Sequence, residues 1–349
     1  MSAPTLVRQE AGTGAGLPVV VAGAGSRGLA AAEALLDAGL EVVLVETADA
    51  VGGLARSVQL WGLPHSLSSP GLAVNAAPQV VAQWLDLSGG HVERTRARHA
   101  LAPHGHRPRV PRRGPEVLSP VAGTGALWAE LARRLRARGA LVLTGATATG
   151  LHVQDGRVAA VRVQDATGEH LLACRGVVDA LPTHRRLLPP GVVAVTSSRD
   201  AHLVHLLVEA PDGAVVGPRA HDVTAAAPGP RVRRLTSARA WRPRTLASAR
   251  GAVLRAELAA PGDELSGADD AALRRLVLAE LPALGVPAPV RVLDDAVLRL
   301  PASLPLAVEE AGGAALAGLV RVEDGPVPGA GDGLTAARAA VQRLAVPVR

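Results

Sequence analysis

The chain has 349 residues, 48% of them hydrophobic, so it can bury a large core and is not a disordered protein. A net charge of +6 and a pI of about 11.1 invite a nucleic-acid ligand, but aromatic residues make up only 1% of the chain, too few to stack bases, and we expect no nucleic-acid partner. The single cysteine, Cys174, excludes a disulfide framework and a CxxC metal site, and no metal is predicted.

The N-terminal residues 1–16 lack the apolar core of a signal peptide and are interpreted as a loose leader. No apolar run has the length of a membrane span. These two observations predict a cytoplasmic protein.

The next stretch, Leu17–Glu46, has the pattern of a βαβ unit. An apolar run of strand length leads into Gly23-Ala-Gly25-Ser-Arg-Gly28, a helical pattern follows, and a second apolar run ends at Glu46. In a dinucleotide fold the first glycine permits a tight turn, the second lets the backbone approach a pyrophosphate, and the third lets the helix pack on the strand.

The same stretch predicts where a dinucleotide would bind. Ser26 and Arg27 begin the helix, whose N-terminus offers amide N–H groups and a positive dipole end to phosphates. Glu46 lies where a carboxylate accepts hydrogen bonds from the ribose hydroxyls and repels a 2′-phosphate, which disfavours NADP.

A glycine doublet, Gly52-Gly53, follows soon after the ribose acid. Together with Gly28-Leu29-Ala30-Ala31-Ala32, it resembles the extended FAD motif of the flavoprotein group that contains amine oxidases, protoporphyrinogen oxidases, phytoene desaturases and UDP-galactopyranose mutases. The resemblance implies FAD as the cofactor and adds the doublet, Leu54 and Arg56 to the predicted site. An ordinary turn is the alternative interpretation of the doublet.

Between this stretch and residue 123 the pattern is less specific. His65 is interpreted as a loop histidine, although the family has a histidine near the flavin at a similar place. Pro78–Leu87 predicts a short amphipathic helix. The basic segment His91–Arg113 is interpreted as a hairpin or surface loop, with an anion site or an acidic membrane surface as the alternatives.

The segment Gly123–Pro182 also resembles the group, in a series of elements ending in Val177-Val178-Asp179-Ala180. The resemblance implies that Ala148 lies beside the FAD adenine. The predicted elements are a helix over Gly123–Gly139, a strand over Ala140–Leu143, a hairpin of Thr147–Gln154 and Arg157–Val163, and a strand over Arg175–Leu181.

A β-rich region follows over His202–Leu258, and Asp269–Leu284 predicts a helix. His202 and His205 are three residues apart, so on a strand they face opposite sides and do not share a ligand.

The C-terminal part, from Arg291 to about Ala345, resembles the group more weakly. Ala314–Gly318 is interpreted as the strand that returns to the flavin, and a glycine turn before the last helix is placed at the flavin edge. The resemblance implies four cofactor residues here: Gly318, Gly329, Asp332 and Leu334.

We therefore predict an α/β fold in which a Rossmann-like FAD domain, of the two-dinucleotide-binding type, is interleaved with a β-rich substrate domain. The FAD domain is assigned to residues 17–74, 123–186 and 310–349, and a reduced substrate domain to 75–122 and 187–309.

The resemblance implies an FAD-dependent oxidoreductase that takes a hydride from an apolar, tetrapyrrole-like or polyene-like small molecule and passes electrons to oxygen or another acceptor. The pattern singles out no catalytic side chain and no oligomeric state, and peripheral membrane contact stays open. The chain has no tyrosine or phenylalanine, so a non-catalytic flavin-binding relative is the first alternative. An NAD-binding dehydrogenase is the second.

Overall fold

The structure is a computed structural model of the whole chain. It describes residues 16–102, 114–182, 185–190, 193–209, 222–225, 231–246, 251–259, 265, 267–286, 291–311 and 316–322, and the side chains of 193–199 and 301–311 are not described.

The chain forms two units, between which it passes after residues 56, 124, 196 and 307. Unit 1 contains Met1–Arg56, Gly125–Thr196 and Val308–Arg349, and unit 2 contains Ser57–Thr124 and Ser197–Ala307. Residues 57–74, assigned to the FAD domain from the sequence, group with unit 2. Which unit holds the cofactor and which the substrate stays a prediction.

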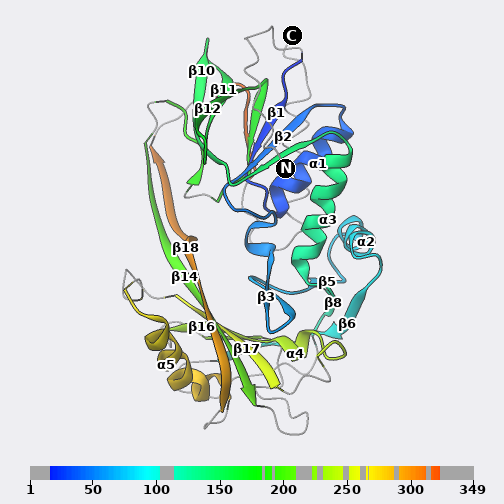
Figure 1. Cartoon of the computed structure of the whole chain (residues 1–349), viewed down its shortest axis with the longest axis vertical. Coiled ribbons are helices and arrows are strands. Elements are labelled where there is room, and N and C mark those ends of the chain that lie inside the picture. The colour runs from blue at the N-terminus through cyan, green and yellow to red at the C-terminus, as the bar shows by residue number, and fades with distance from the viewer. Residues whose placement is uncertain are drawn as a thin grey trace. The chain divides into compact units, whose positions relative to one another are not determined.

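Unit 1 is built on a parallel sheet in the order β19-β13-β1-β2-β9 (Figure 1). The central strands are continuous apolar runs, as strands covered on both faces require, and all four residues of β1 are fully buried. The strands are β1 (Val19–Ala22), β2 (Val42–Glu46), β9 (Leu141–Thr144), β13 (Gly176–Asp179) and β19 (Leu319–Arg321).

Helix α1 (Ser26–Asp37) packs on this sheet through a stripe of small and aliphatic residues that are buried, from Leu29 to Leu35. It ends where Gly39, at a φ of +75°, lets the chain turn into β2. Helix α3 (Thr124–Ala137) buries Leu127, Leu131 and Leu135 at a spacing of four residues. Both helices agree with the sequence-based prediction.

An antiparallel three-stranded sheet completes the described part of unit 1. Its apolar face packs in one core with β1 and β13, through residues such as Val161, Val163 and Val177. The third strand was not predicted. The strands are β10 (Thr147–Gln154), β11 (Arg157–Asp165) and β12 (Gly168–Ala173).

Unit 2 contains a six-stranded sheet in the order β18-β14-β17-β16-β15-β7, of which Figure 1 labels β14, β16, β17 and β18. Helix α5 (Asp270–Glu280), capped by the Asp269 side chain, continues into a 3₁₀ turn at Leu281–Leu284 and packs into the core of this sheet. The strands are β7 (His99–Ala102), β14 (Val193–Glu209), β15 (Asp222–Ala225), β16 (Val232–Ser237), β17 (Gly251–Leu258) and β18 (Val292–Ala311).

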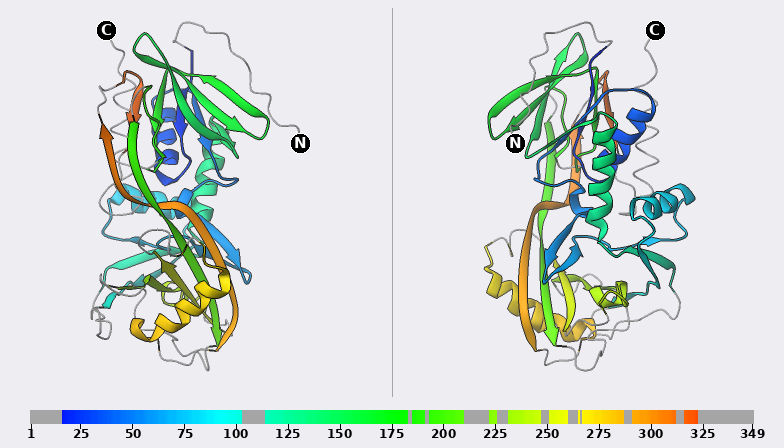
Figure 2. Two further views of the ribbon diagram at one scale, coloured as in Figure 1. Left: turned by 90° about the vertical axis from the view of Figure 1, so that its left-hand side faces the viewer. Right: turned by 45° about the vertical axis from the view of Figure 1, so that its right-hand side comes forward.

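The remaining elements of unit 2 are short. A hairpin is formed by β3 (Ser57–Leu60) and β4 (Leu63–Ser66), and helix α2 (Pro78–Leu87) lies where the sequence predicts it. Figure 2 shows both from two further sides. The other elements are a 3₁₀ turn at Gly53–Ala55 in unit 1, strands β5 (Leu72–Ala73), β6 (Val92–Arg96) and β8 (Glu116–Pro120), and helix α4 (Ala238–Trp241).

Two sequence-based interpretations in unit 2 are wrong. His65 is not in a loop but in β4, where it is 5% exposed. The segment from His91 is not a hairpin, because β6 pairs with β8 whereas β7 pairs in parallel with β15. The two errors have different causes. His65 lies in a short local hairpin with β3, whereas β6 and β7 pair with strands further along the chain, which local periodicity does not reveal. Residues 103–113 lie outside the described part.

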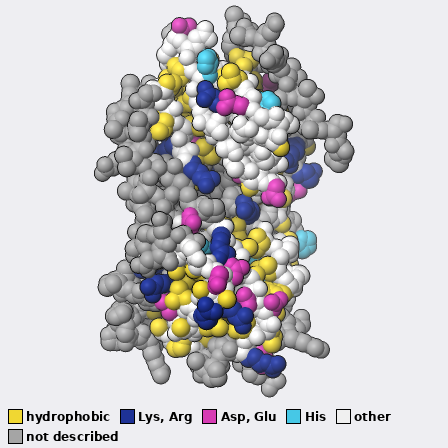
Figure 3. Space-filling model, turned by 60° about the vertical axis from the view of Figure 1, so that its left-hand side comes forward, with side chains coloured by type: hydrophobic (Ala, Val, Ile, Leu, Met, Phe, Trp, Pro, Cys, Tyr) yellow, Lys and Arg dark blue, Asp and Glu magenta, His cyan; other side chains and the backbone are white. Residues whose placement is uncertain are grey.

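No helix among the described residues is long and apolar enough to cross a membrane. On the face drawn in Figure 3, basic and acidic side chains lie interspersed among the described residues. Several arginines form ion pairs, such as Arg133 and Arg134 with Glu130.

Candidate cofactor site

The turn between β1 and α1 requires glycine at two positions, for different reasons. Gly23 has a φ of +92°, which L-residues rarely adopt. A Cβ on Gly28 would lie 1.8 Å from the Gly23 carbonyl oxygen. Gly28 therefore lets the first turn of α1 lie directly against the turn that precedes it.

Gly25 differs from its neighbours because its free side is open. Its φ of −67° and ψ of 179° suit any residue, and a Cβ there would meet only the Cα of Gly53, at 4.0 Å. Nothing in the protein's own packing requires glycine at this position. A ligand that approaches the backbone closely would require it.

The glycine doublet lies against this turn. Gly25 and Gly52 form a parallel bridge, and the Gly52 amide donates to the Ala24 carbonyl over 2.8 Å. Gly52 has a φ of +104°, and a Cβ there would lie 3.1 Å from the Trp128 ring of α3. The loop that contains Gly52 and Gly53 therefore packs against the turn that contains Gly25. An ordinary turn, the alternative interpretation of the doublet, would not need this contact.

Glu46 lies at the carboxyl end of β2, next to the glycine turn. Its carboxylate accepts hydrogen bonds from the amides of Ala24 (2.8 Å) and Ala48 (2.9 Å). A carboxylate has about four lone pairs, so it can still accept from ribose hydroxyls. The amide of Ala146 donates to the Glu46 carbonyl, which brings the start of β10, and so Ala148, to the same edge of the sheet.

The N-terminus of α1 has the features of an anion site. No side chain caps it, and its first turn contains no acidic residue. The first intrahelical bond runs from Leu29 to Gly25, so the amides of the preceding residues have no acceptor within the helix. Ser26 and Arg27 are half-buried here. Burial lowers the pKa of Arg27, and Arg186 lowers it further.

The other residues predicted at this end of the sheet follow the doublet. Leu54 is 45% exposed in the 3₁₀ turn, and Arg56 ends that turn with its amide bonded to the Gly53 carbonyl. The structure therefore brings together the predicted residues from Gly23 to Arg56, with Ala148 beside them.

Asp179 is a residue of this edge that the sequence analysis did not single out. It ends β13, one strand from the glycine turn, and is 1% exposed. Its carboxylate accepts from the amides of Leu181 (3.1 Å) and Leu187 (2.8 Å). Burial raises its pKa to about 6, although these bonds, Arg321 and Arg186 oppose the rise. The sequence contained a signal that could have identified Asp179, because a charged residue ends an otherwise apolar strand.

Asp179 should make stability depend on pH. Because its pKa rises from 3.8 to about 6 on folding, its contribution is fully present below pH 4 and is lost as the pH rises through 6, by up to about 3 kcal/mol. In Asp179→Asn this loss is absent, so the variant should gain stability relative to the wild type between pH 4 and 7. Urea unfolding across that range measures it, with the exposed Asp49→Asn as control. Parallel curves for Asp179→Asn and the wild type would contradict the assignment.

The C-terminal residues of the predicted site need a correction. Gly318 precedes β19, whose register with β13 pairs Leu319 with Val177 and Arg321 with Asp179. Gly318 therefore lies at the amino end of the parallel sheet, whereas the glycine turn lies at the carboxyl end, and the structure does not bring them together. The described strand that joins the sheet here is β19, and of the predicted strand Ala314–Gly318 only residues 316–318 are described, which precede β19. Gly329, Asp332 and Leu334 lie outside the described residues.

Residues 18–182 match the FAD dependent oxidoreductase family, and this segment contains the glycine turn, Glu46, the doublet and Asp179. This match spans a little under half of the chain and supports the resemblance to the FAD-dependent oxidoreductase group. The fold is α/β, and the match supports an oxidoreductase enzyme with FAD as its cofactor, as the resemblance implied. No curated protein sequence matches it significantly.

Solved structures with a similar fold are only distantly related in sequence. A proposed protoporphyrinogen oxidase from Exiguobacterium sp. 255-15 has 13% identity and a TM-score of 0.70, over 95% of this chain and 99% of that one. Reduced UDP-galactopyranose mutase has 13% identity and a TM-score of 0.63, over 83% and 82%. A double mutant of putrescine oxidase has 11% identity and a TM-score of 0.62, over 94% and 98%. At these identities the likeness concerns the fold alone.

Proposed function

We propose that this oxidoreductase binds FAD at the carboxyl edge of the unit 1 sheet and oxidises an apolar small molecule. The observation that carries the proposal is the open side of Gly25, lined by the glycine doublet and next to Glu46. When bound, FAD supplies a flavin ring that accepts a hydride at N5.

In this proposal, the residues of the chain position the cofactor. The Gly25 backbone and the first turn of α1 hold the pyrophosphate, whose negative charge the helix N-terminus and Arg27 stabilise. Glu46 accepts hydrogen bonds from the ribose hydroxyls, and the backbone near Ala148 lies beside the adenine. The doublet favours FAD over NAD, since the family's extended FAD motif contains it and NAD binding does not need it.

The proposal assigns no side chain as a catalytic acid or base. Cys174 is buried, and burial raises the pKa of its thiol to about 12, so it stays protonated and is a poor nucleophile. The proposed chemistry needs the protein to orient substrate and flavin and to exclude water, with the electrons then passing to oxygen or another acceptor.

A substrate like those of the protoporphyrinogen oxidase or desaturase branches is the specific hypothesis. Its support is the resemblance of the N-terminal motif and the similar fold of the proposed Exiguobacterium protoporphyrinogen oxidase.

The test is anaerobic reduction of the bound flavin by a panel of porphyrinogens, polyenes and amines. We expect bleaching of the visible flavin band by a porphyrinogen or polyene and not by the amines. Bleaching by amines alone would contradict the substrate class. If dithionite bleaches the flavin but no panel member does, the non-catalytic alternative is favoured.

A further inference from the structure

A pocket in unit 2 is lined by polar side chains that are all buried. His65 of β4 and His205 of β14 both line it, and their rings pack edge to face, with centroids 5.7 Å apart and the planes at 73°. Arg255 of β17 and Arg242, which follows α4, also line the pocket. None of the four residues is more than 5% exposed.

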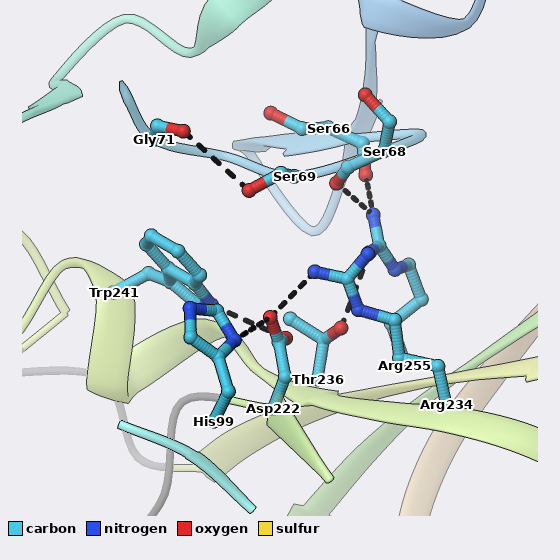
Figure 4. Close-up of polar contacts among 10 residues, drawn as sticks. All are labelled: Ser66, Ser68, Ser69, Gly71, His99, Asp222, Arg234, Thr236, Trp241 and Arg255. Carbon is cyan, nitrogen blue, oxygen red and sulfur yellow. Dashed lines mark hydrogen bonds and ion pairs between the residues drawn. The ribbon is translucent and has the colours of Figure 1, made fainter. Parts of the chain in front are cut away.

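The two arginines bring positive charge to the pocket, and no described carboxylate forms a hydrogen bond or ion pair with either. Arg255 donates to the carbonyls of Ser66 and Ser68 and to the Thr236 hydroxyl, as Figure 4 shows. Arg242 donates to the carbonyls of Val121 and Pro64. Neither takes part in any ion pair that the structure describes.

The buried carboxylate of Asp222, which acts on Arg255, already has several hydrogen-bond partners. It accepts from Arg234, from His99 at 3.1 Å and from the Trp241 indole at 3.4 Å (Figure 4). Burial would raise the pKa of Asp222, but these bonds and one from Thr236 lower it overall. Asp222 forms its ion pair with Arg234, and among the described residues neither Arg255 nor Arg242 has a carboxylate as an ion-pair partner.

Hydrogen-bonding groups in the pocket also lack partners. Both ring nitrogens of His205, Nε2 of His65 and Nε of Arg255 are buried with no partner among the described residues. An unpartnered buried polar group is costly, so several together indicate a missing polar ligand. A divalent cation is disfavoured beside two arginines, whereas an acceptor with negative charge suits the Arg255 Nε–H and one ring N–H of His205, and would suit His65 Nε2 once that ring is protonated.

The size of the pocket limits the ligand. Its cavity is about 30 Å³, and one water needs about 10–15 Å³. That is space for about two water-sized groups, which matches the two oxygens of a carboxylate better than the four of a phosphate. Pro70 and Val253 add apolar lining on which a hydrocarbon stem could pack.

We propose that the pocket binds one carboxylate group, of a small organic acid or of a larger apolar acid, between Arg255, Arg242 and the two histidines. The guanidinium Nε–H and a ring N–H of His205 donate to it. This inference concerns unit 2 by itself and does not depend on the proposed flavin site.

His65 adds a proton to this binding event. Its ring bonds to the Leu60 backbone, which leaves Nε2 as an acceptor in the neutral form. Burial and Arg242 lower its pKa to about 4, and burial, Arg255 and His65 lower that of His205 to about 3, so both are neutral before binding. A bound carboxylate offsets the arginine charge, so His65 takes up a proton and donates from Nε2.

The charged and titratable groups around the two rings come from several elements. The charge of Glu93 acts on Arg242, although no ion pair between them is found among the described residues, and the Glu93 carboxylate accepts from the backbone amides of Arg244 and Thr245. The charged groups that act on the two histidine rings, or on Arg242 and Arg255 beside them, are Arg255 and Glu257 on β17, Arg234 on β16, Asp222 on β15, Glu93 on β6 and Arg242.

The test is calorimetric titration of the full chain, with and without FAD, using sodium propionate at pH 6 to 8. We expect propionate binding to weaken as the pH rises, because binding is coupled to the uptake of a proton. Heats of binding that differ between buffers would show this uptake. Phosphate and chloride should bind at least about tenfold more weakly, because the cavity and the planar donor set fit a carboxylate.

His205→Leu should weaken propionate binding at least about tenfold, the cost of a hydrogen bond to a charged group. The matched control is His202→Leu, since His202 is on the same strand and 2% exposed but does not line the pocket. His65→Gln should flatten the pH dependence. If a variant fails to fold, NMR spectra of the wild-type protein labelled with ¹⁵N-histidine provide the test instead. The ring nitrogen signals of two histidines, His65 and His205, should then shift when propionate is added.

Three results would overturn the proposal: propionate that does not bind, an affinity that His205→Leu leaves unchanged, or an affinity that does not change with pH. Tighter binding of phosphate or chloride would overturn the carboxylate assignment. A failure of FAD to bind would leave these results untouched, so the two proposals are tested separately.

Discussion

Among the single glycine-to-alanine substitutions at the turn between β1 and α1, we expect Gly28→Ala to destabilise unit 1 the most. The new Cβ would lie 1.8 Å from the Gly23 carbonyl oxygen, and a separation of at least 3.0 Å requires that backbone to retreat by about 1.2 Å. The neighbouring strand β1 is fully buried and cannot yield freely. We expect a loss of about 3 kcal/mol or more in the free energy of unfolding.

Urea unfolding of FAD-free protein measures this loss. Gly150→Ala is the control, because nothing lies within 4 Å of its Cβ position and its backbone is not in the left-handed region, so its effect should stay within about 0.5 kcal/mol. Equal stability of Gly28→Ala and Gly150→Ala would show that α1 does not lie against the turn as described.

Gly25→Ala adds the same methyl group three residues earlier and should act on the cofactor, not on the fold. The position accepts a Cβ, so the free energy of unfolding of FAD-free protein should change by less than about 1 kcal/mol. The methyl group would occupy the side where the pyrophosphate approaches. We therefore expect FAD affinity to fall at least about 100-fold, the effect of overpacking by about 3 kcal/mol.

Fluorescence titration with FAD measures the affinity, and the unfolding curve of the same preparation is the control for folding. The contrast between the two variants is the informative result: Gly28→Ala loses stability, whereas Gly25→Ala loses ligand. Retained FAD affinity in Gly25→Ala would mean that the pyrophosphate does not lie on this turn.

The first βαβ unit was predictable because its determinants are local. The apolar run before Gly23, the helical spacing after it and Glu46 at the end of the second run lie within thirty residues, and each agrees with the others. The doublet was also visible in the sequence, but its bridge to Gly25 was not, because no pattern specifies which loops touch.

The pocket of unit 2 could not be predicted for the same reason. His65 and His205 are 140 positions apart, and β7 pairs with a strand more than a hundred residues later. The spacing of His202 and His205 correctly predicted that they do not share a site. It did not indicate that the His205 ring contacts the His65 ring. Gly318 shows the opposite error: its motif resembled the family's, but it precedes the strand instead of following it.

Hydrogen exchange, followed by mass spectrometry with and without FAD, tests the placement of the cofactor most directly. We predict that FAD slows amide exchange over residues 23–30 and 46–56 and leaves the strands β15, β16 and β17 of unit 2 unchanged. Protection that is absent from the glycine turn and its doublet, with FAD bound, would contradict the account.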